Sequence, residues 1–537
     1  MTPWVRCLLG AVAVSALGSG AIAGEPKPGG TLIFGVEAEP PNYDCHANTS
    51  FAFIHPVRPH YSTLLKFDPA HYPAVIGDLA ESWSVSADQK TYSFTLKPNV
   101  TFHDGSPLTS EDVKASYERI IHPSQGVVSA RAATYEDIVA IETPTPLSLV
   151  FRLGAPNPAM PTLLASPWNC IYSAAKLRQD PKWPEQHILG SGPFRFVQHI
   201  AGAEWRGARF AGYFEPHKPY LDGYQALFIK GAAAINALQA GQILAEFRGQ
   251  SPVDRDKLVA ALGDKVVVQQ SPWVCNLVVA FNTKRKPFDD RRVRRALSLA
   301  IDRWNSAVPL SKITFIGPVG GVLRPGYEFA AKPAELEQLP GFSHDIAASR
   351  AEAKQLLKEA GVPALTLKLT NRNIDAPYTP VGVLLIDQWR RIGVAAEHQQ
   401  LETQLYQAAL RSGNYDAAID FSCDFTDEPD LQLAKYISAD RSPVNYGGYI
   451  DRTLDELYEK QKRATDPYRA LRPGAPVRKP RAERGLYGDD LLVAAHHRAC
   501  GAAERLAHHA QPLRQPGPRR RLARSVSPAW IASLRSQ

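Results

Sequence analysis

The chain has 537 residues, with 61 Lys and Arg against 53 Asp and Glu, which gives a formal net charge of +8. The basic surplus lies at the C-terminal end: 14 Lys and Arg but only 4 Asp and Glu occur from Tyr468 onward, so the rest of the chain carries a net charge of −2. A nucleic-acid-binding protein needs a basic face on its folded body. Composition therefore argues against nucleic acid as a partner.

The N-terminal residues have the pattern of an export signal. Arg6 precedes a short apolar run, and the small residues Ala21 and Ala23 follow that run, as in a cleaved secretory signal peptide. Gly and Ser interrupt the run, which is short for the roughly 20 residues that a bilayer span needs. We predict that residues 1–23 are removed and that the exported, soluble protein begins near Gly24.

The following residues predict strands alternating with helices. Tyr92, Phe94 and Leu96 alternate with polar residues, which indicates a strand with one buried face. Thr109 or Ser110 is a suitable N-cap for the next helix, which has acidic residues in its first turn. In chain order, the predicted strands are 31–38, 91–102, 364–370, 394–400 and 415–421, and the predicted helices are 109–121, 288–303, 349–361 and 379–393. This alternation predicts an α/β fold with parallel sheet segments and helices packed outside.

Two blocks of sequence carry a family resemblance: "KPNVTFHDGSPLTSEDVKASYERI" at 97–120 and "NTKRKPFDDRRVRRALSLAIDR" at 282–303. Three other stretches carry the same resemblance: "KPGGTLIFGVEAEP", "GSGPFRFVQHI" and "YDAAIDFSCDFTDEPDLQLAKY". Over about residues 29–467 the chain resembles the periplasmic dipeptide- and oligopeptide-binding proteins of ABC importers, extracellular solute-binding family 5.

The resemblance implies a two-lobed α/β fold of the class II periplasmic-binding-protein type. Lobe I, with an inserted subdomain, is expected at 24–272 and lobe II at 273–467. The implied function is to bind a short peptide between the lobes in the periplasm and to deliver it to an inner-membrane permease, as a monomer without a cofactor. A nickel chelate, an opine or a sugar remains an alternative solute, because a fold does not fix its ligand.

Residues 468–537 are rich in Pro and Arg and show no hydrophobic period of 2 or 3.6. A solvated, disordered tail explains such a composition better than a nucleic-acid arm does. Codons compatible with this segment, when read one base later, permit the ending expected of the resembled proteins. We therefore interpret 468–537 as an out-of-frame, irregular tail that replaces the segment returning to lobe I and leaves that lobe poorly covered. A non-functional frameshifted product is the class-level alternative.

A buried peptide needs a carboxylate for its ammonium group and a cation for its carboxylate. By resemblance, Asp424 would hold the amino end, although it could instead be a turn or capping acid. Arg372 would offer its guanidinium fork to the ligand carboxylate, although it could also be a surface arginine. Trp273 and Phe425 are expected to line the cleft or to be core residues, and the segment at Glu39 to offer backbone to the ligand.

The cysteines suit an exported protein. Cys275 and Cys423 occupy positions that resemble a disulfide pair of the oligopeptide binder, which an oxidising compartment would allow. No C-x-x-C or H-E-x-x-H spacing supports a metal site. G-x-S-x-G, P-loop and Rossmann patterns are also missing from the sequence, so we predict a binding protein and not an enzyme.

Overall fold

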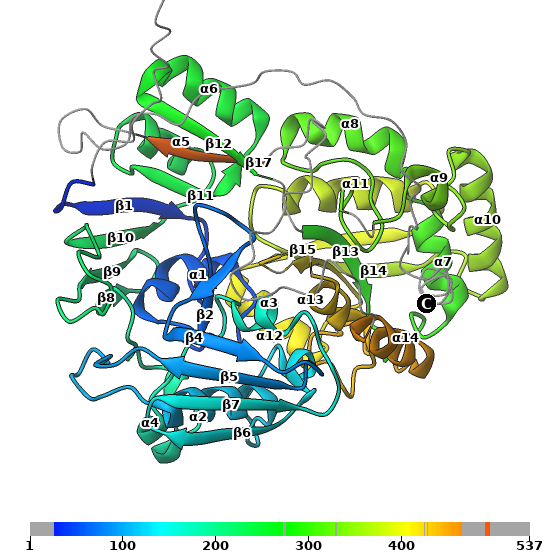
Figure 1. The fold of residues 1–537 in the computed structure, drawn as a ribbon. Coiled ribbons are helices and arrows are strands. Elements are labelled where there is room, and N and C mark those ends of the chain that lie inside the picture. The colour runs from blue at the N-terminus through cyan, green and yellow to red at the C-terminus, as the bar shows by residue number, and fades with distance from the viewer. Residues whose placement is uncertain are drawn as a thin grey trace, which may run out of the picture.

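The computed structural model describes residues 26–271, 275–327, 330–423, 425–426, 428–463 and 489–494. It contains two α/β lobes, each built on its own main sheet (Figure 1). Lobe I comprises the seven-stranded sheet and an antiparallel subdomain, and lobe II comprises the four-stranded sheet of β13, β16, β14 and β15. The predicted boundary at 272/273 lies between the last residue of β12, Ser271, and the first residue of β13, Cys275.

The main sheet of lobe I has the order β12-β17-β11-β1-β10-β9-β8. β1 runs parallel to both β10 and β11, whereas β9 and β17 run antiparallel to their neighbours. Apolar residues of α1 cover one face, and α5 and α6 cover the other. The bounds are β1 Thr31–Val36, β8 Phe194–Ile200, β9 Glu204–Arg209, β10 Gly223–Phe228, β11 Ala245–Gln250, β12 Val266–Ser271, β17 Asp489–Ala494, α1 Phe51–Val57, α5 Ala232–Gln239 and α6 Pro252–Leu262.

The subdomain of lobe I is the antiparallel sheet β4-β5-β7-β6 with α2 packed on it. The predicted buried face of β5 is confirmed, since Tyr92, Phe94 and Leu96 are buried. The strand ends at Leu96 and not at residue 102, because Pro98 has no N–H to continue the ladder. The bounds are β2 Leu65–Phe67, β3 Val75–Gly77, β4 Ala80–Val85, β5 Thr91–Leu96, β6 Ile138–Thr145, β7 Ser148–Leu153, α2 Ser110–Ile121, α3 Met160–Leu164 and α4 Ala174–Gln179.

The sheet of lobe II pairs β14 in parallel with β15 and β16, and β13 antiparallel with β16. Its core includes side chains from α7, α10 and α11. The predicted helix 288–303 is wrong as a single element: Asp290 and Asp302 each cap a separate helix, α7 and α8. The bounds are β13 Cys275–Phe281, β14 Thr366–Arg372, β15 Ala395–Leu401, β16 Ala417–Cys423, α7 Arg291–Leu299, α8 Arg303–Ile313, α9 Pro333–Leu336, α10 Ile346–Glu359, α11 Tyr378–Arg390, α12 Thr403–Ser412, α13 Pro429–Leu433 and α14 Arg452–Lys462.

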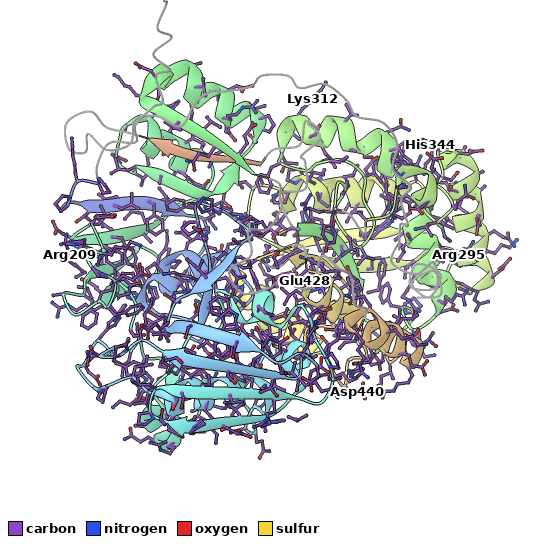
Figure 2. All side chains as sticks on the ribbon, viewed as in Figure 1. Arg209, Arg295, Lys312, His344, Glu428 and Asp440 are labelled. Atoms are coloured by element: carbon purple, nitrogen blue, oxygen red, sulfur yellow. A yellow bond between two sulfur atoms is a disulfide. The ribbon has the colours of Figure 1, made fainter. Side chains whose placement is uncertain are left out.

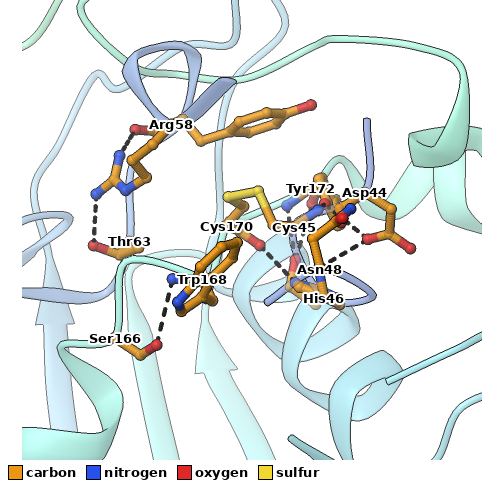
Figure 3. The surroundings of a disulfide bond; sticks show 12 residues. Asp44, Cys45, His46, Asn48, Arg58, Thr63, Ser166, Trp168, Cys170 and Tyr172 are labelled. Atoms are coloured by element: carbon orange, nitrogen blue, oxygen red, sulfur yellow. Dashed lines mark hydrogen bonds between the residues drawn. A yellow bond between two sulfur atoms is a disulfide. The ribbon is translucent and has the colours of Figure 1, made fainter. Parts of the chain in front are cut away.

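A buried disulfide, Cys45–Cys170, joins two distant segments of lobe I (Figure 3). Its Cα atoms are 6.0 Å apart and the sequence separation is 125 residues. Beside it, both oxygens of the Asp44 carboxylate accept hydrogen bonds from Arg119, at 2.6 and 3.1 Å. Neither cysteine of this pair had a partner predicted from the sequence.

β17 corrects one expectation about the C-terminal segment. Residues Asp489–Ala494, within the segment predicted to be irregular, form a strand between β11 and β12. The ladder explains this difference, because backbone groups of two neighbouring strands can pair with an added strand whatever its side chains are. Lobe I therefore contains a strand from beyond lobe II. The other residues of 464–537 lie outside the described part of the chain.

Candidate ligand-binding site

A cavity of about 1130 Å³ lies between the two lobes. Lobe I contributes the residues that follow or end the parallel strands β1 and β11, together with α1. Lobe II contributes β13, the end of β14, and helices α7, α8 and α11. Ligands of open α/β sheets bind at the carboxyl ends of parallel strands, so the position of this cavity is that of a binding site.

Arg372, the last residue of β14, is the buried cation of the lobe II wall. It is 3% exposed, and its guanidinium carbon lies 5.2 Å from the ring centre of Tyr378, 4.8 Å from Tyr406 and 4.4 Å from Phe421. Burial lowers its pKa, but the neighbouring tyrosines and Asp420 outweigh burial, so the pKa is raised and the group stays charged.

Some N–H donors of the Arg372 guanidinium have no acceptor among the described residues. Among the described residues, no atom accepts a hydrogen bond from its Nε or Nη2. A buried donor without an acceptor costs about 1–3 kcal/mol, and more when it is charged. An anion that accepts hydrogen bonds from this guanidinium offsets the cost of its burial, and a carboxylate matches the guanidinium fork.

Arg248, in β11, is the corresponding cation of the lobe I wall. Its Nη1 donates to Glu37 Oε2 at 2.7 Å, and its side chain is 10% exposed. The guanidinium carbon lies 5.5 Å from the ring centre of Tyr378, which belongs to lobe II. Two arginines from opposite lobes thus contact the same ring.

The carboxyl groups of Glu37 and Glu246 lie next to Arg248. Burial raises the pKa of Glu37, although Arg248 acts against this. Burial, together with the nearby Glu37, raises the pKa of Glu246 to about 7, while the backbone N–H groups of Arg248 and Gly249 donate to its carboxylate at 2.8 and 2.9 Å. These two hydrogen bonds hold the irregular stretch of β11 that contains Arg248.

Direct hydrogen bonds join the lobes. Lys230 Nζ of lobe I donates to Glu402 of lobe II at 3.2 Å, and Gln404 Nε2 of lobe II donates to the carbonyl oxygen of Pro40 at 3.3 Å. The hydroxyl of Tyr72 donates to the carbonyl oxygen of Phe425 at 3.1 Å. The lobes are therefore in direct contact.

The predicted site residues do not all meet at the cavity. Arg372 lines it. Phe425 packs 5.5 Å from Phe67 and is not among the lining residues. Glu39 is also outside the lining: it pairs with His199 at 2.7 Å and accepts from the N–H of Gly202.

Other predicted positions remain predictions. Asp424 and Trp273 lie outside the described residues. The ladder pairs Cys275 with Cys423, and the disulfide between them stays a prediction. In the described part of the chain, no cluster of His, Cys, Asp or Glu could hold a metal ion, and no helix has the length and apolar character to cross a membrane.

Arg248, Glu37 and Tyr378 were not predicted from the sequence. The only available signal for the first two was a charged residue at the end of an apolar strand, "TLIFGVE" or "ILAEFR". Tyr378 follows Pro377 in the stretch already singled out for Arg372. None of these signals shows that β1, β11 and α11 meet at one cavity.

The family model of the bacterial extracellular solute-binding proteins, family 5 (middle), matches residues 74–442. The chain belongs to this family. It is 30% identical over 293 residues to the glutathione-binding protein GsiB of Pectobacterium atrosepticum, a match that covers 54% of the chain and 53% of GsiB. It is 27% identical over 487 residues to di/tripeptide-binding protein 1 of Pseudomonas aeruginosa, covering 85% and 88% of the two chains. The match thus spans about half of the first relative and most of the second.

Solved structures agree with the two-lobed fold. The periplasmic binding protein DppA of Helicobacter pylori, in complex with the peptide STSA, superposes with a TM-score of 0.73 at 22% identity, over 88% of this chain and 95% of that one. The binding protein AgaA of A. tumefaciens R10, in complex with agropinic acid, gives 0.72 at 25% identity, over 87% and 93%. The predicted fold class and family are therefore confirmed, and the family and these neighbours are binding proteins.

Proposed function

We propose that the protein is the substrate-binding component of an ABC importer, that it binds a short peptide between its lobes, and that it delivers the peptide to a permease. The observation that carries this proposal is the buried guanidinium of Arg372, a residue of the wall of a cavity between two lobes, two of whose nitrogens have no acceptor among the described residues. A peptide carboxylate is an acceptor of the required shape and charge. The relative named for di- and tripeptides and the neighbour bound to STSA support a peptide as the solute.

The remaining parts of the proposal concern the ends of the peptide and the form of the protein. Asp424, which directly follows β16, would hold the peptide ammonium. Cys275 and Cys423, which are register partners, would form a second disulfide. The protein would act in the periplasm as a monomer after removal of residues 1–23, with lobe I at 24–272 and lobe II at 273–467.

Isothermal titration calorimetry with matched peptides tests this function. Ala-Ala and Ala-Ala-Ala are compared with their C-terminal amides, and Arg372→Gln is compared with Arg390→Gln, whose side chain is 79% exposed on α11. Loss of one partner of a buried charge pair costs about 2–5 kcal/mol, so amidation should weaken binding at least about thirtyfold. Arg372→Gln should weaken the free acid similarly and remove the preference for the acid, whereas Arg390→Gln should change neither.

Equal binding of acid and amide would refute the role of Arg372, and absence of binding by every peptide would refute the peptide function. Specific peptide binding by the full-length chain would reject the alternative of a non-functional frameshifted product.

A further inference from the structure

The charged groups that line the cavity are almost all cationic. Among the described residues, seven arginines line it, and Glu37 is the only lining carboxylate. His55 is also there, but burial lowers its pKa to about 4, so it is neutral at neutral pH. A cleft lined by one sign of charge in low-dielectric walls concentrates solutes of the opposite sign. The positive charge of this lining exceeds what is needed to bind the single carboxylate of one peptide.

Several of these arginines are held by the protein itself. Arg295 pairs with Glu352 at 2.7 Å, and Arg303 donates to the carbonyl oxygen of Ser298 at 3.0 Å. Arg372 and Arg248 differ from them, because each has a buried nitrogen with no acceptor among the described residues: Nε and Nη2 of Arg372, and Nε of Arg248. They also come from opposite lobes.

Tyr378 brings the two arginines together. Its ring centre lies 5.2 Å from the guanidinium carbon of Arg372 and 5.5 Å from that of Arg248. Glu37 occupies only Nη1 of Arg248, and guanidinium groups have five N–H donors in a planar fork. A second acceptor can therefore approach Arg248 without replacing Glu37.

We propose that the preferred solute has two carboxylates, one bound by Arg372 of lobe II and the second by Arg248 of lobe I. This inference rests on the proposed function and narrows its substrate class to acidic peptides, with non-peptide dicarboxylates as the corresponding class if peptides do not bind. The second carboxylate contacts lobe I while the first contacts lobe II, so a dianionic solute joins the lobes through ionic hydrogen bonds. A ligand favours closure by its additional contacts in the closed state.

The test uses probe pairs that differ only in one carboxylate. Ala-Glu is compared with Ala-Gln, Ala-Glu-Ala with Ala-Gln-Ala, and glutarate with its monoamide, by calorimetry on the full chain. We expect the acid to bind at least about tenfold more tightly than the amide, or about 1.4 kcal/mol, in at least one pair. Arg248→Gln should reduce this ratio to less than about threefold.

Three further variants separate recognition from folding. Arg248→Lys keeps the charge but not the fork, so it should retain an intermediate preference. Glu37→Gln combined with Arg248→Gln leaves no unpaired carboxylate at this position and should lose the preference while remaining folded. Arg209→Gln is the matched control, since Figure 2 shows Arg209 at the outer edge of lobe I, where it pairs with Asp222, and it should bind like the parent.

The outcomes distinguish the two proposals. Equal affinities within every pair, or a preference that survives Arg248→Gln, overturn the two-carboxylate inference even if peptides bind. Binding of glutarate over its monoamide through Arg248, without binding of any peptide, upholds the inference and refutes the peptide function. If no probe binds to the folded chain, both proposals are refuted.

Discussion

The disulfide Cys45–Cys170 should contribute much of the stability of lobe I. Replacing both residues by alanine frees a loop whose ends are 125 residues apart. In the chain-entropy description, closing a loop of this length stabilises the folded state by about 5 kcal/mol relative to the unfolded chain. Native-state relaxation and residual structure in the unfolded chain reduce such values, so we expect a loss of about 3–5 kcal/mol for Cys45→Ala/Cys170→Ala.

Urea unfolding followed by tryptophan fluorescence measures this loss. Trp168 is buried two residues from Cys170 and reports on the linked segment. The parent is measured with and without reductant, and thiol titration in denaturant establishes how many cysteines are oxidised. Reductant should destabilise the parent but have a smaller effect on the double variant. A variant that unfolds within about 1 kcal/mol of the oxidised parent would refute the argument from the unfolded chain.

Three other changes give separable results. Glu246 has a pKa of about 7 in the folded protein against 4.5 as a model group, so folding favours its protonated form, and the stability it contributes at low pH is lost as pH rises from about 4.5 to 7. Thermal unfolding should show a loss of up to about 3 kcal/mol over this window that Glu246→Gln abolishes; an unchanged pH profile would contradict this reasoning. Arg119→Met leaves the Asp44 carboxylate, whose side chain is 0% exposed, without its cation. This variant should lose about 3–5 kcal/mol of unfolding free energy in urea, and adding Asp44→Asn should recover part of that loss. A single variant as stable as the double variant would refute the pairing. Lys230→Gln breaks the exposed ion pair with Glu402. The melting temperature should stay nearly unchanged, and solute dissociation in stopped-flow measurements should become less than about fivefold faster. A larger change in the dissociation rate would mean that this contact holds the lobes together.

Local chemistry explains which elements could be predicted from the sequence. Thr109, one of the two expected N-caps, starts α2 and forms a capping box with Asp112, and alternating burial defines β5. The ends were less predictable: β14 continues two residues beyond its apolar run, through Asn371 and Arg372, because it pairs with β15 along that length. Pairing partners determine where a strand ends, and the sequence of one strand does not contain them.

In the candidate site, too, features set by local sequence could be predicted, and features set by contacts between distant residues could not. Arg372 was accessible through resemblance, because its chemistry and its position after an apolar run are both local. Arg248 and Tyr378 are 130 residues apart and contact each other across two lobes, and Cys45 and Cys170 are brought together by intervening elements. No periodicity or motif encodes such long-range proximity. The strand β17 was missed for a related reason, since a place between two strands, and not its own pattern, explains its conformation.

The hydrogen bonds between the lobes have a consequence for transport. Lys230, Gln404 and Tyr72 make these bonds to protein groups alone, so their free energy favours the shut arrangement whether or not cargo is inside. Each 1.4 kcal/mol of such bias raises the proportion of shut, unloaded molecules about tenfold. A permease that recognises the shut outline would then meet unloaded competitors, and import would fall when the binding protein greatly outnumbers its cargo.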